Sequence, residues 1–423
     1  MIFFLHFSNF LSEFSIQPYY IIMPKKHYSI IVEKMAHYTY KFRLYPNKEQ
    51  QYRLSAHFGC CRFVYNHFLD ERKTAYEQSG ESPNYYDQAA TLTKLKKEKT
   101  WLKETNSQVL QFSLKCLQAA YNNFFAKRAK FPRFHAKKNK QSFTVPQHVK
   151  VQDGKLYFPK FSDGMKIKLH RQIEGEIKHA TISKNCAGQY FVCIIVERNI
   201  GLLPKVKREV GIDLGITALA TPSIGKAFEN IRPYRTLQKR LRALDKDLHR
   251  KKLGSKNREK ARYKVARLHN KIANIRNDHL HKVSRRIVDD NQVICLEDLN
   301  VKGMMKNRCL AKSIADVSLS ELVRQIEYKS GWYGRQVIKI DRWFPSSKMC
   351  SSCGYVMETL PLDVRSWCCP RCEVKHNRDR NAAKNILVEG KRTVGTTELA
   401  CGLGVRLESN RKRLRVKQEA PTL

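Results

Sequence analysis

Residues 350–383 have the sequence CSSCGYVMETLPLDVRSWCCPRCEVKHNRDRNAA, and this stretch decides how the rest of the chain is interpreted. It contains two Cys-x-x-Cys pairs separated by fifteen residues, made of Cys350, Cys353, Cys369 and Cys372. Two such pairs at this separation are typical of a zinc site with four thiolate ligands. Because four thiolates leave no open coordination position, we expect this zinc to be structural.

Two neighbouring residues compete for a place among the zinc ligands. Cys368 directly precedes Cys369, and His376 follows the second pair. We expect Cys369 to be the ligand, because Cys-Pro-x-Cys is a common tight turn around zinc and keeps the two-residue spacing.

Three acidic residues lie at positions where a buried charge needs a reason. Asp379 stands just before a run that predicts a helix, and Asp213 and Glu297 lie in apolar runs that predict buried strands. A carboxylate in an apolar strand is costly to bury without a partner. Each residue alone has an ordinary explanation: Asp213 can form a turn, and Asp379 can cap its helix. Asp298 can substitute for its neighbour Glu297 or support it.

Taken together, Asp213, Glu297 and Asp379 predict an active centre. They lie at strand ends and at a helix start, in an order of elements that matches a ribonuclease-H-like sheet. Such a sheet gathers carboxylates around two divalent metal ions about 3.5–4 Å apart, which clamp the scissile phosphate of a nucleic acid. Hard oxygen ligands favour magnesium or manganese at this centre.

Charge is the outlying property of the composition. The chain of 423 residues has 80 Lys and Arg against 38 Asp and Glu, a formal charge of +42. This excess predicts a polyanionic partner, because each contacted phosphate of a nucleic acid releases counterions. An anionic membrane ranks lower, since the positive charge is spread along the whole sequence. The hydrophobic fraction of 42% indicates a folded protein, and the length predicts two to four domains.

The cysteines and the first residues indicate the compartment. Thirteen cysteines in a long chain do not predict a secreted disulfide framework, so we expect a reducing, cytoplasmic and nucleoid-associated protein. The apolar start lacks a basic region and carries His6 and Glu13, which makes it a poor signal peptide. No apolar run approaches the length of a membrane span. Regular patterning begins at Met35, so residues 1–34 are expected to be a mis-called start or a leader.

Periodicity divides the rest of the chain. Residues 38–45 alternate as a strand does, and residues 48–129 predict helices interrupted around 79–84. Short strands and turns over 141–200 predict a small antiparallel barrel or sheet, which the strand at 38–45 could join. Residues 127–140 are basic with interleaved aromatic residues, and fit either a solvated loop or a nucleic-acid contact.

A long basic helical hairpin is predicted over residues 232–288. This segment has 20 Lys and Arg against four Asp and Glu, and Gly254-Ser255 breaks it in the middle. Leucines recur at helical spacing before the break and aliphatic residues recur after it. The pair of helices could serve solubility alone, but so large an excess favours contact with nucleic acid. After it we expect a strand at 292–297, a loop at 301–315, and a further helix and strand.

Several of these motifs resemble one family. They are YKFRLYPNKEQ (40–50), GIDLGI (211–216), CLEDLN (295–300), FPSSKMCSSCG (344–354) and RDRNAAKNI (378–386). In this order they resemble the OrfB, or TnpB, family of bacterial insertion sequences, over about residues 35–390. Members are compact RNA-guided DNA nucleases, similar in their catalytic domain to type V CRISPR effectors. One departure is Asn377, where the family often has Asp in His-Asp-Arg-Asp.

The resemblance implies an α/β protein with an added β-barrel and helical lobe. Its nuclease domain is RuvC-like, with an RNase H fold, and its catalytic acids match Asp213, Glu297 and Asp379. The implied parts are a leader (1–34), a wedge-like β-barrel (35–47 and 131–204), a helical recognition lobe (48–130), the nuclease (205–345 and 376–390), an inserted zinc ribbon (346–375) and a basic flexible tail (391–423). Implied partners are a guide RNA from the transposon end and double-stranded DNA beside a short flanking motif.

Three functions follow from these patterns. The first is an RNA-guided DNA endonuclease that uses magnesium or manganese and helps to maintain its transposon. The second is a DNA-binding accessory or regulator of transposition whose nuclease is silent, which the charge fits equally well. The third is a strand-transferring transposase that uses the same carboxylate chemistry, although the sequence shows no separate nucleophile such as a catalytic tyrosine.

Overall fold

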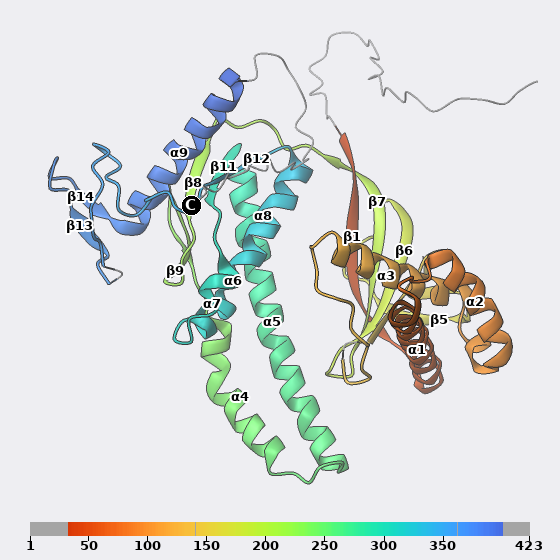
Figure 1. Cartoon of the computed structure of the whole chain (residues 1–423). Coiled ribbons are helices and arrows are strands. Elements are labelled where there is room, and N and C mark those ends of the chain that lie inside the picture. The colour runs from red at the N-terminus through yellow and green to blue at the C-terminus, as the bar shows by residue number, and fades with distance from the viewer. Residues whose placement is uncertain (1–32, 140, 362, 401–423) are drawn as a thin grey trace, which may run out of the picture. The chain divides into compact units, whose positions relative to one another are not determined.

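The structure is a computed structural model that describes residues 33–139, 141–361 and 363–400 (Figure 1). The first strand begins at Glu33, close to the start of regular patterning that the sequence predicts. The predicted leader lies, except for its last two residues, outside the described residues, as does the predicted tail beyond residue 400. Within the described residues, no helix is both long enough and apolar enough to cross a membrane.

The first half of the chain forms a seven-stranded antiparallel sheet. Its members are β1 (Glu33–Tyr45), β2 (Gln141–Val145), β3 (Lys150–Gln152), β4 (Lys155–Phe158), β5 (Phe161–Lys168), β6 (Glu176–Lys184) and β7 (Tyr190–Gly201). The order across the sheet is β2-β6-β7-β1-β5-β4-β3, so the early strand β1 does join the later ones, as predicted. β2 and β3 stand at its two ends. The prediction is thus confirmed as far as an antiparallel sheet, and closure into a barrel stays a prediction.

The predicted helical block is present between β1 and β2. It comprises α1 (Lys48–Ser79), α2 (Tyr85–Glu98), the short 3₁₀ helix η1 (Thr100–Glu104) and α3 (Ser107–Phe125). Asn47 begins α1 with a capping box that includes Gln50, and Gly80 ends it in the left-handed conformation that glycine adopts without strain. Buried residues of these helices and of the sheet form one apolar core, in which the rings of Phe58 and Phe143 lie 5.2 Å apart.

The second half of the chain is built on a mixed five-stranded sheet. Its strands are β8 (Glu209–Asp213), β9 (Ala218–Pro222), β10 (Phe228–Glu229), β11 (Val293–Glu297) and β12 (Gln336–Ile340), in the order β10-β9-β8-β11-β12. β8, β9 and β10 are antiparallel, whereas β8, β11 and β12 run parallel. The apolar centres of β8 and β11 are buried, because helices cover both faces of the sheet.

Alternation along the strands assigns the two faces. Ile294 and Leu296 belong to the core formed with α5 (Lys256–Asp290) and α8 (Leu319–Tyr333), whereas Cys295 between them packs against α9 (Arg378–Ala400). Because successive side chains of a strand point to opposite faces, Gly211 and Asp213 of β8 share the α9 face, as do Cys295 and Glu297 of β11. Figure 1 shows α9 beside β8 and β11.

Gly211 lets α9 approach the sheet closely. A Cβ atom at this position would lie 2.1 Å from the carbonyl oxygen of Ala383 and 2.5 Å from the amide nitrogen of Leu387, both on α9. Such contacts are impossible without a shift of backbone, so only glycine fits between β8 and the helix. The first glycine of the GIDLGI motif therefore fixes the distance between the strand that ends in Asp213 and the helix that begins beside Asp379.

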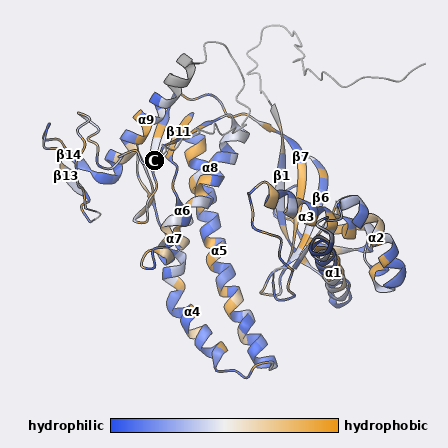
Figure 2. Ribbon diagram, in the orientation of Figure 1, coloured by the Kyte–Doolittle hydropathy of each residue, from blue (hydrophilic) through white to orange (hydrophobic). Residues whose placement is uncertain are grey.

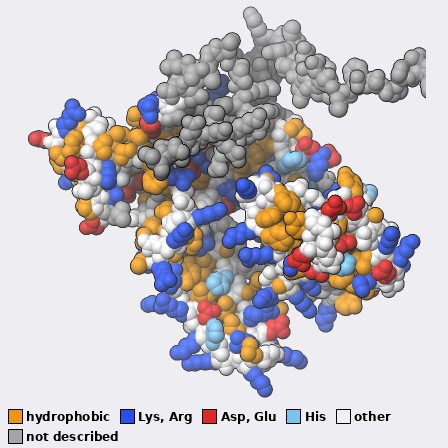
Figure 3. Space-filling view, in the orientation of Figure 1, with side chains coloured by type: hydrophobic (Ala, Val, Ile, Leu, Met, Phe, Trp, Pro, Cys, Tyr) orange, Lys and Arg blue, Asp and Glu red, His pale blue; other side chains and the backbone are white. Residues whose placement is uncertain are grey.

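The basic hairpin is formed as predicted, by α4 (Pro233–His249) and α5, with a turn around Gly254. Leu241, Leu268 and Ile272 make a small buried seam between the two helices. Figure 2 shows both helices as mainly hydrophilic, and Figure 3 shows Lys and Arg side chains gathered around the end of the hairpin. Because this buried seam is narrow, much of the hairpin is exposed to solvent, where its Lys and Arg side chains lie.

One prediction of secondary structure was wrong. The predicted loop at 301–315 contains α6 (Val301–Met304) and most of α7 (Ala311–Val317), where buried Ile314 and Val317 pack inward and override weak local patterning. The predicted tail from 391 is helical as far as Ala400, where α9 ends, and its flexibility stays a prediction. No proline interrupts residues 391–400, and an ion pair between Glu389 and Arg392 supports that turn of the helix.

Candidate active site

The structure brings the three predicted carboxylates together on the α9 face of the five-stranded sheet. Asp213 ends β8, Glu297 ends the adjacent parallel strand β11, and Asp379 lies in the first turn of α9. Burial first, and then the negative charges of Glu297 and Asp379, together raise the pKa of Asp213 to about 7. Asp213 is therefore close enough to both other carboxylates to be repelled by them, and the role of each residue in chemistry stays a prediction.

Each of the other two carboxylates has one polar partner. The hydroxyl of the buried Ser346 donates a hydrogen bond to Oε1 of Glu297. Burial raises the pKa of Glu297, and this hydrogen bond opposes the shift. The guanidinium of Arg365 lies 3.6 Å from Oδ1 of Asp379. One hydroxyl and one half-exposed arginine leave most oxygen lone pairs of the cluster available for a cation.

Asp298, the predicted substitute for Glu297, is directed elsewhere. Its carboxylate is paired with Arg342, and both side chains are nearly half exposed. Asn377, the departure from the family pattern, accepts a hydrogen bond of 3.0 Å from the backbone N–H of Arg380 and so caps α9. The predicted alternative, that Asp379 is the cap, is thus not needed. An Asp at position 377 could accept the same bond, so this substitution keeps the local structure.

The four predicted cysteines form a compact cluster. Within the part of the chain that the structure describes, only this group of potential metal ligands has all its donor atoms within 4.8 Å of one another. The Sγ atoms of Cys350 and Cys372 are 3.6 Å apart, as are those of Cys353 and Cys369. The backbone N–H of Ser352 lies 3.4 Å from the Sγ of Cys350, an arrangement suited to a thiolate. The cluster can hold one metal ion.

The two competing ligands are placed outside this cluster. Cys368 is exposed, and its thiol donates to the carbonyl oxygen of Glu373. His376 is buried with Nε2 3.0 Å from the Sγ of Cys350, so it contacts a ligand and is not a member of the four. Cys369, and not Cys368, thus belongs to the cluster, and its role as a zinc ligand stays a prediction. A histidine beside a ligating sulfur can hold that sulfur in place and reduce its negative charge.

Two asparagines of α9 that sequence reasoning missed connect the cysteine cluster to the carboxylates. Asn385 donates to the carbonyl oxygens of Ser346 (2.8 Å) and Met349 (2.6 Å). Asn381 donates to the carbonyl oxygen of Met349 (2.6 Å) and accepts from the N–H of Ser351. Both side chains are almost fully buried. The sequence did hold a signal for them. Asparagine is a poor helix former, so two asparagines four residues apart on one face of a predicted helix indicate a role in tertiary contacts.

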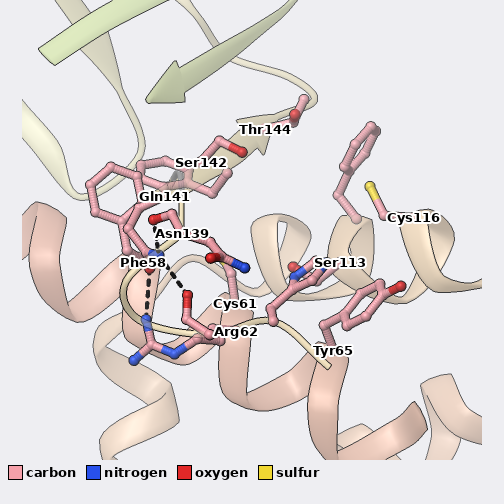
Figure 4. Close-up of a pocket in the computed structure, with 14 residues that line it drawn as sticks. Phe58, Cys61, Arg62, Tyr65, Ser113, Cys116, Asn139, Gln141, Ser142 and Thr144 are labelled. Carbon is pink, nitrogen blue, oxygen red and sulfur yellow. Dashed lines mark hydrogen bonds between the residues drawn. The ribbon is translucent and has the colours of Figure 1, made fainter. Parts of the chain in front are cut away.

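A pocket lies elsewhere, between α1, α3 and residues of the segment 135–144 (Figure 4). Its volume is about 270 Å³. Arg62 donates to Oε1 of Gln141 on its wall at 2.7 Å, and the Gln141 amide donates to the carbonyl oxygen of Asn139. Since none of the three carboxylates lines it, the pocket is separate from the candidate active site.

Comparison with known proteins identifies the family. The model of a family described as "Probable transposase" (OrfB of IS605) matches residues 193–308, a "Cas12f1-like, TNB domain" matches 320–386, and a "Helix-turn-helix domain" matches 35–81. A Streptomyces pristinaespiralis protein named "Putative RNA-guided DNA endonuclease" is 43% identical over 90% of this chain and 96% of its own length. This chain belongs to the OrfB/TnpB family.

Two further relatives agree with this assignment. A protein of Escherichia coli K12 named "Putative RNA-guided DNA endonuclease InsQ" is 35% identical over 86% of this chain and 94% of its own length. A Cas12f1 chain, solved in a complex with guide RNA and target DNA, covers 83% of this chain and 98% of its own with a TM-score of 0.52 and 13% identity. At that identity the likeness shows the fold alone, which this OrfB/TnpB protein shares with Cas12f1.

The raised pKa of Asp213 predicts how stability changes with pH in magnesium-free buffer. Because the folded state holds this proton more tightly than the unfolded chain, stability falls as pH rises from about 4 to about 7. Asp213→Asn should therefore be more stable than the wild type at pH 8, by roughly 2–4 kcal/mol, and equal to it near pH 4. Urea unfolding at both pH values measures this. Equal stabilities at pH 8 would contradict the assigned environment of Asp213.

The asparagine contacts predict a cost to stability. Asn385→Ala should lower the free energy of unfolding by about 1–3 kcal/mol, because the buried carbonyl oxygen of Ser346 loses its hydrogen-bond donor and that of Met349 loses one of two. The exposed neighbour Lys384 provides the control, and Lys384→Ala should change stability by less than about 0.5 kcal/mol. Denaturant titration of the two variants measures the difference. Similar losses in both would show that the asparagine does not hold residues 346–349.

Proposed function

We propose that this OrfB/TnpB protein is an RNA-guided DNA endonuclease that hydrolyses phosphodiesters at Asp213, Glu297 and Asp379. The observation that carries the proposal is the convergence of these carboxylates on one face of the sheet. The strand order β10-β9-β8-β11-β12, with three antiparallel strands followed by two parallel ones, supports a RuvC-like RNase H fold. The names of the two relatives support the same reaction.

The donor set suits hard divalent cations. Three carboxylates offer oxygen ligands, which favour magnesium or manganese over softer metals. Two bound ions would activate a water and stabilise the leaving oxygen of a phosphodiester. Two residues of the protein would assist the carboxylates. Ser346 orients Glu297 through its hydroxyl, and Arg365 beside Asp379 supplies a positive charge for a phosphate. Gly211 and α9 keep the acidic side chains on one side of the sheet.

Nucleic acids are the proposed partners. A net charge of +42 needs a polyanion to offset its self-repulsion, and the hairpin of α4 and α5 exposes much of it. The guide would be an RNA from the transposon end, and base pairing would select the double-stranded target while the protein holds backbones and reads a flanking motif. We assign residues 35–47 and 131–204 to a wedge domain and residues 48–130 to a recognition lobe. Free thiols favour a cytoplasmic, nucleoid-associated protein.

The cysteine cluster is proposed to hold structural zinc. Four thiolates within 4.8 Å, with no carboxylate among them, match the closed tetrahedral sites that zinc prefers. Its contribution to the reaction is indirect. The cluster fixes the segment that starts at Ser346, and the asparagines of α9 connect that segment to the helix that begins at Asp379.

The sequence of co-purified RNA tests the guided reaction against the two alternatives. Protein expressed with its native flanking locus should carry one discrete RNA that ends at the boundary of the element. A heterogeneous mixture or no RNA would favour a DNA-binding regulator or a strand-transferring transposase. Joined DNA products in vitro would select the transposase.

Removal of a central carboxylate should abolish guided cleavage. Asp213→Ala, Glu297→Ala and Asp379→Ala should each slow cleavage more than about 100-fold, beyond the 10- to 100-fold typical of groups that only support a metal ligand. Asp298→Asn is the control and should stay within about fivefold, because an exposed ion pair contributes ~0–1 kcal/mol. Cleavage of a guided target over time measures both. Guided cutting by Asp213→Ala would refute the proposal.

Two adjacent cysteines provide a matched test of the zinc site. Cys369→Ser should lose bound zinc and lower the melting temperature, since it removes one of four thiolates. Cys368→Ser should keep zinc at one ion per chain, because this thiol contacts only the carbonyl oxygen of Glu373. Elemental analysis of the purified variants measures the zinc. Zinc loss in Cys368→Ser, with zinc retained in Cys369→Ser, would reverse the ligand assignment.

A further inference from the structure

One aromatic side chain, in the loop that joins β12 to Ser346, is left exposed by the fold. Trp343 follows β12 and is 85% exposed, whereas the next residue, Phe344, packs against the core beside α9. Burial of an indole ring normally stabilises a fold, because transfer of apolar surface from water is favourable. The chain thus buries one ring of this pair and presents the other to solvent.

The loop that carries Trp343 is held in a defined conformation. The N–H of Trp343 donates to Oδ1 of Asp341 at 2.7 Å, and the N–H of Phe344 donates to the carbonyl oxygen of Asp341. The preceding Arg342 is paired with Asp298. These contacts form an Asx turn whose tip is the indole ring. The backbone of a turn fixed in this way loses little conformational freedom when a ligand covers its side chain.

Both ends of this loop are attached at Glu297. Ile340, the last residue of β12, is the register partner of Glu297, and Ser346 donates a hydrogen bond to its carboxylate. Trp343 lies three residues from each of these anchors. Three residues of extended chain span at most about 10 Å. The backbone of Trp343 is therefore no farther than this from each anchor at Glu297, a distance that a few nucleotides of a bound strand can cover.

We propose that Trp343 is a stacking platform for an unpaired nucleobase of the DNA strand that enters the carboxylate site. The inference rests on the proposed function, which brings a phosphodiester to Glu297. Aromatic side chains beside a strand's backbone bind single-stranded nucleic acid by stacking on its bases, without dependence on sequence. The ring would hold one base while Arg365 and the cations hold the phosphates, and so position the scissile bond.

Cleavage of substrates with single abasic nucleotides tests this proposal. Trp343→Ala should slow guided cleavage about 5- to 150-fold, the range that corresponds to loss of one base–aromatic stack. Trp343→Phe should recover most of the rate. One abasic position near the cut should slow the wild type by a similar factor and cause no further loss in Trp343→Ala, because ring and base act as one pair. Val388→Ala, which removes an apolar side chain of 63% exposure on α9, is the control and should leave the rate unchanged.

The proposal would be overturned if the loss of rate from Trp343→Ala added to the loss from an abasic nucleotide at every position. It would also be overturned if Trp343→Ala cut at the wild-type rate. A binding measurement separates this outcome from failure of the proposed function. Asp213→Ala protein is mixed with single-stranded oligonucleotides that contain 2-aminopurine, whose fluorescence falls when it stacks. The added substitution Trp343→Ala should relieve that quenching at one position, and Val388→Ala should not. If the wild type never cuts guided DNA, the proposed function fails, yet this quenching still decides the role of the indole.

Discussion

The contact between α9 and the five-stranded sheet is the constraint on which the candidate site depends. Gly211 allows the backbones of β8 and α9 to approach until a Cβ atom would overlap the helix. Gly390 of α9 allows a similar close approach to β11, because a Cβ atom on this glycine would lie 2.4 Å from the Sγ of Cys295. Two such points fix both the distance and the direction of the helix. Asp379, which lies two amino acids beyond the cap of α9, is thereby placed against the ends of β8 and β11.

The same helix also organises the metal-binding segment. Asn381 and Asn385 stand on the buried side of α9 and bond the backbone of residues 346–351. That segment begins with the serine that holds Glu297 and ends at the first cysteine pair. Loss of Asn385 would leave the buried carbonyl oxygen of Ser346 without this donor, which is costly in a protein interior. The cysteine cluster and the carboxylates are therefore one mechanical unit, although they are chemically distinct.

Much of this arrangement could be predicted from the sequence because its parts have local signatures. Cysteine spacing identified the four-sulfur cluster, and apolar runs ending in Asp213 and Glu297 identified adjacent buried strands. What was missed depends on tertiary contacts. The helices α6 and α7 have weak local patterns, and the roles of Ser346, Asn385 and Trp343 follow from which neighbours they meet or fail to meet. No periodicity distinguishes an asparagine that holds a loop from one that faces solvent.

The electrostatics of the site follow from acids placed within a basic protein. Three carboxylates near one another repel each other, and they would also repel the phosphate of any nucleic acid that the rest of the chain attracts. The charges of Arg378 and Arg365 lower the pKa of Asp213, but burial and the other two carboxylates outweigh them. Divalent cations resolve both repulsions, since one ion can bind carboxylate and phosphate oxygens together. In the proposed function the basic surface would concentrate nucleic acid, and cations at the carboxylates would admit its backbone to this acidic part of the α9 face.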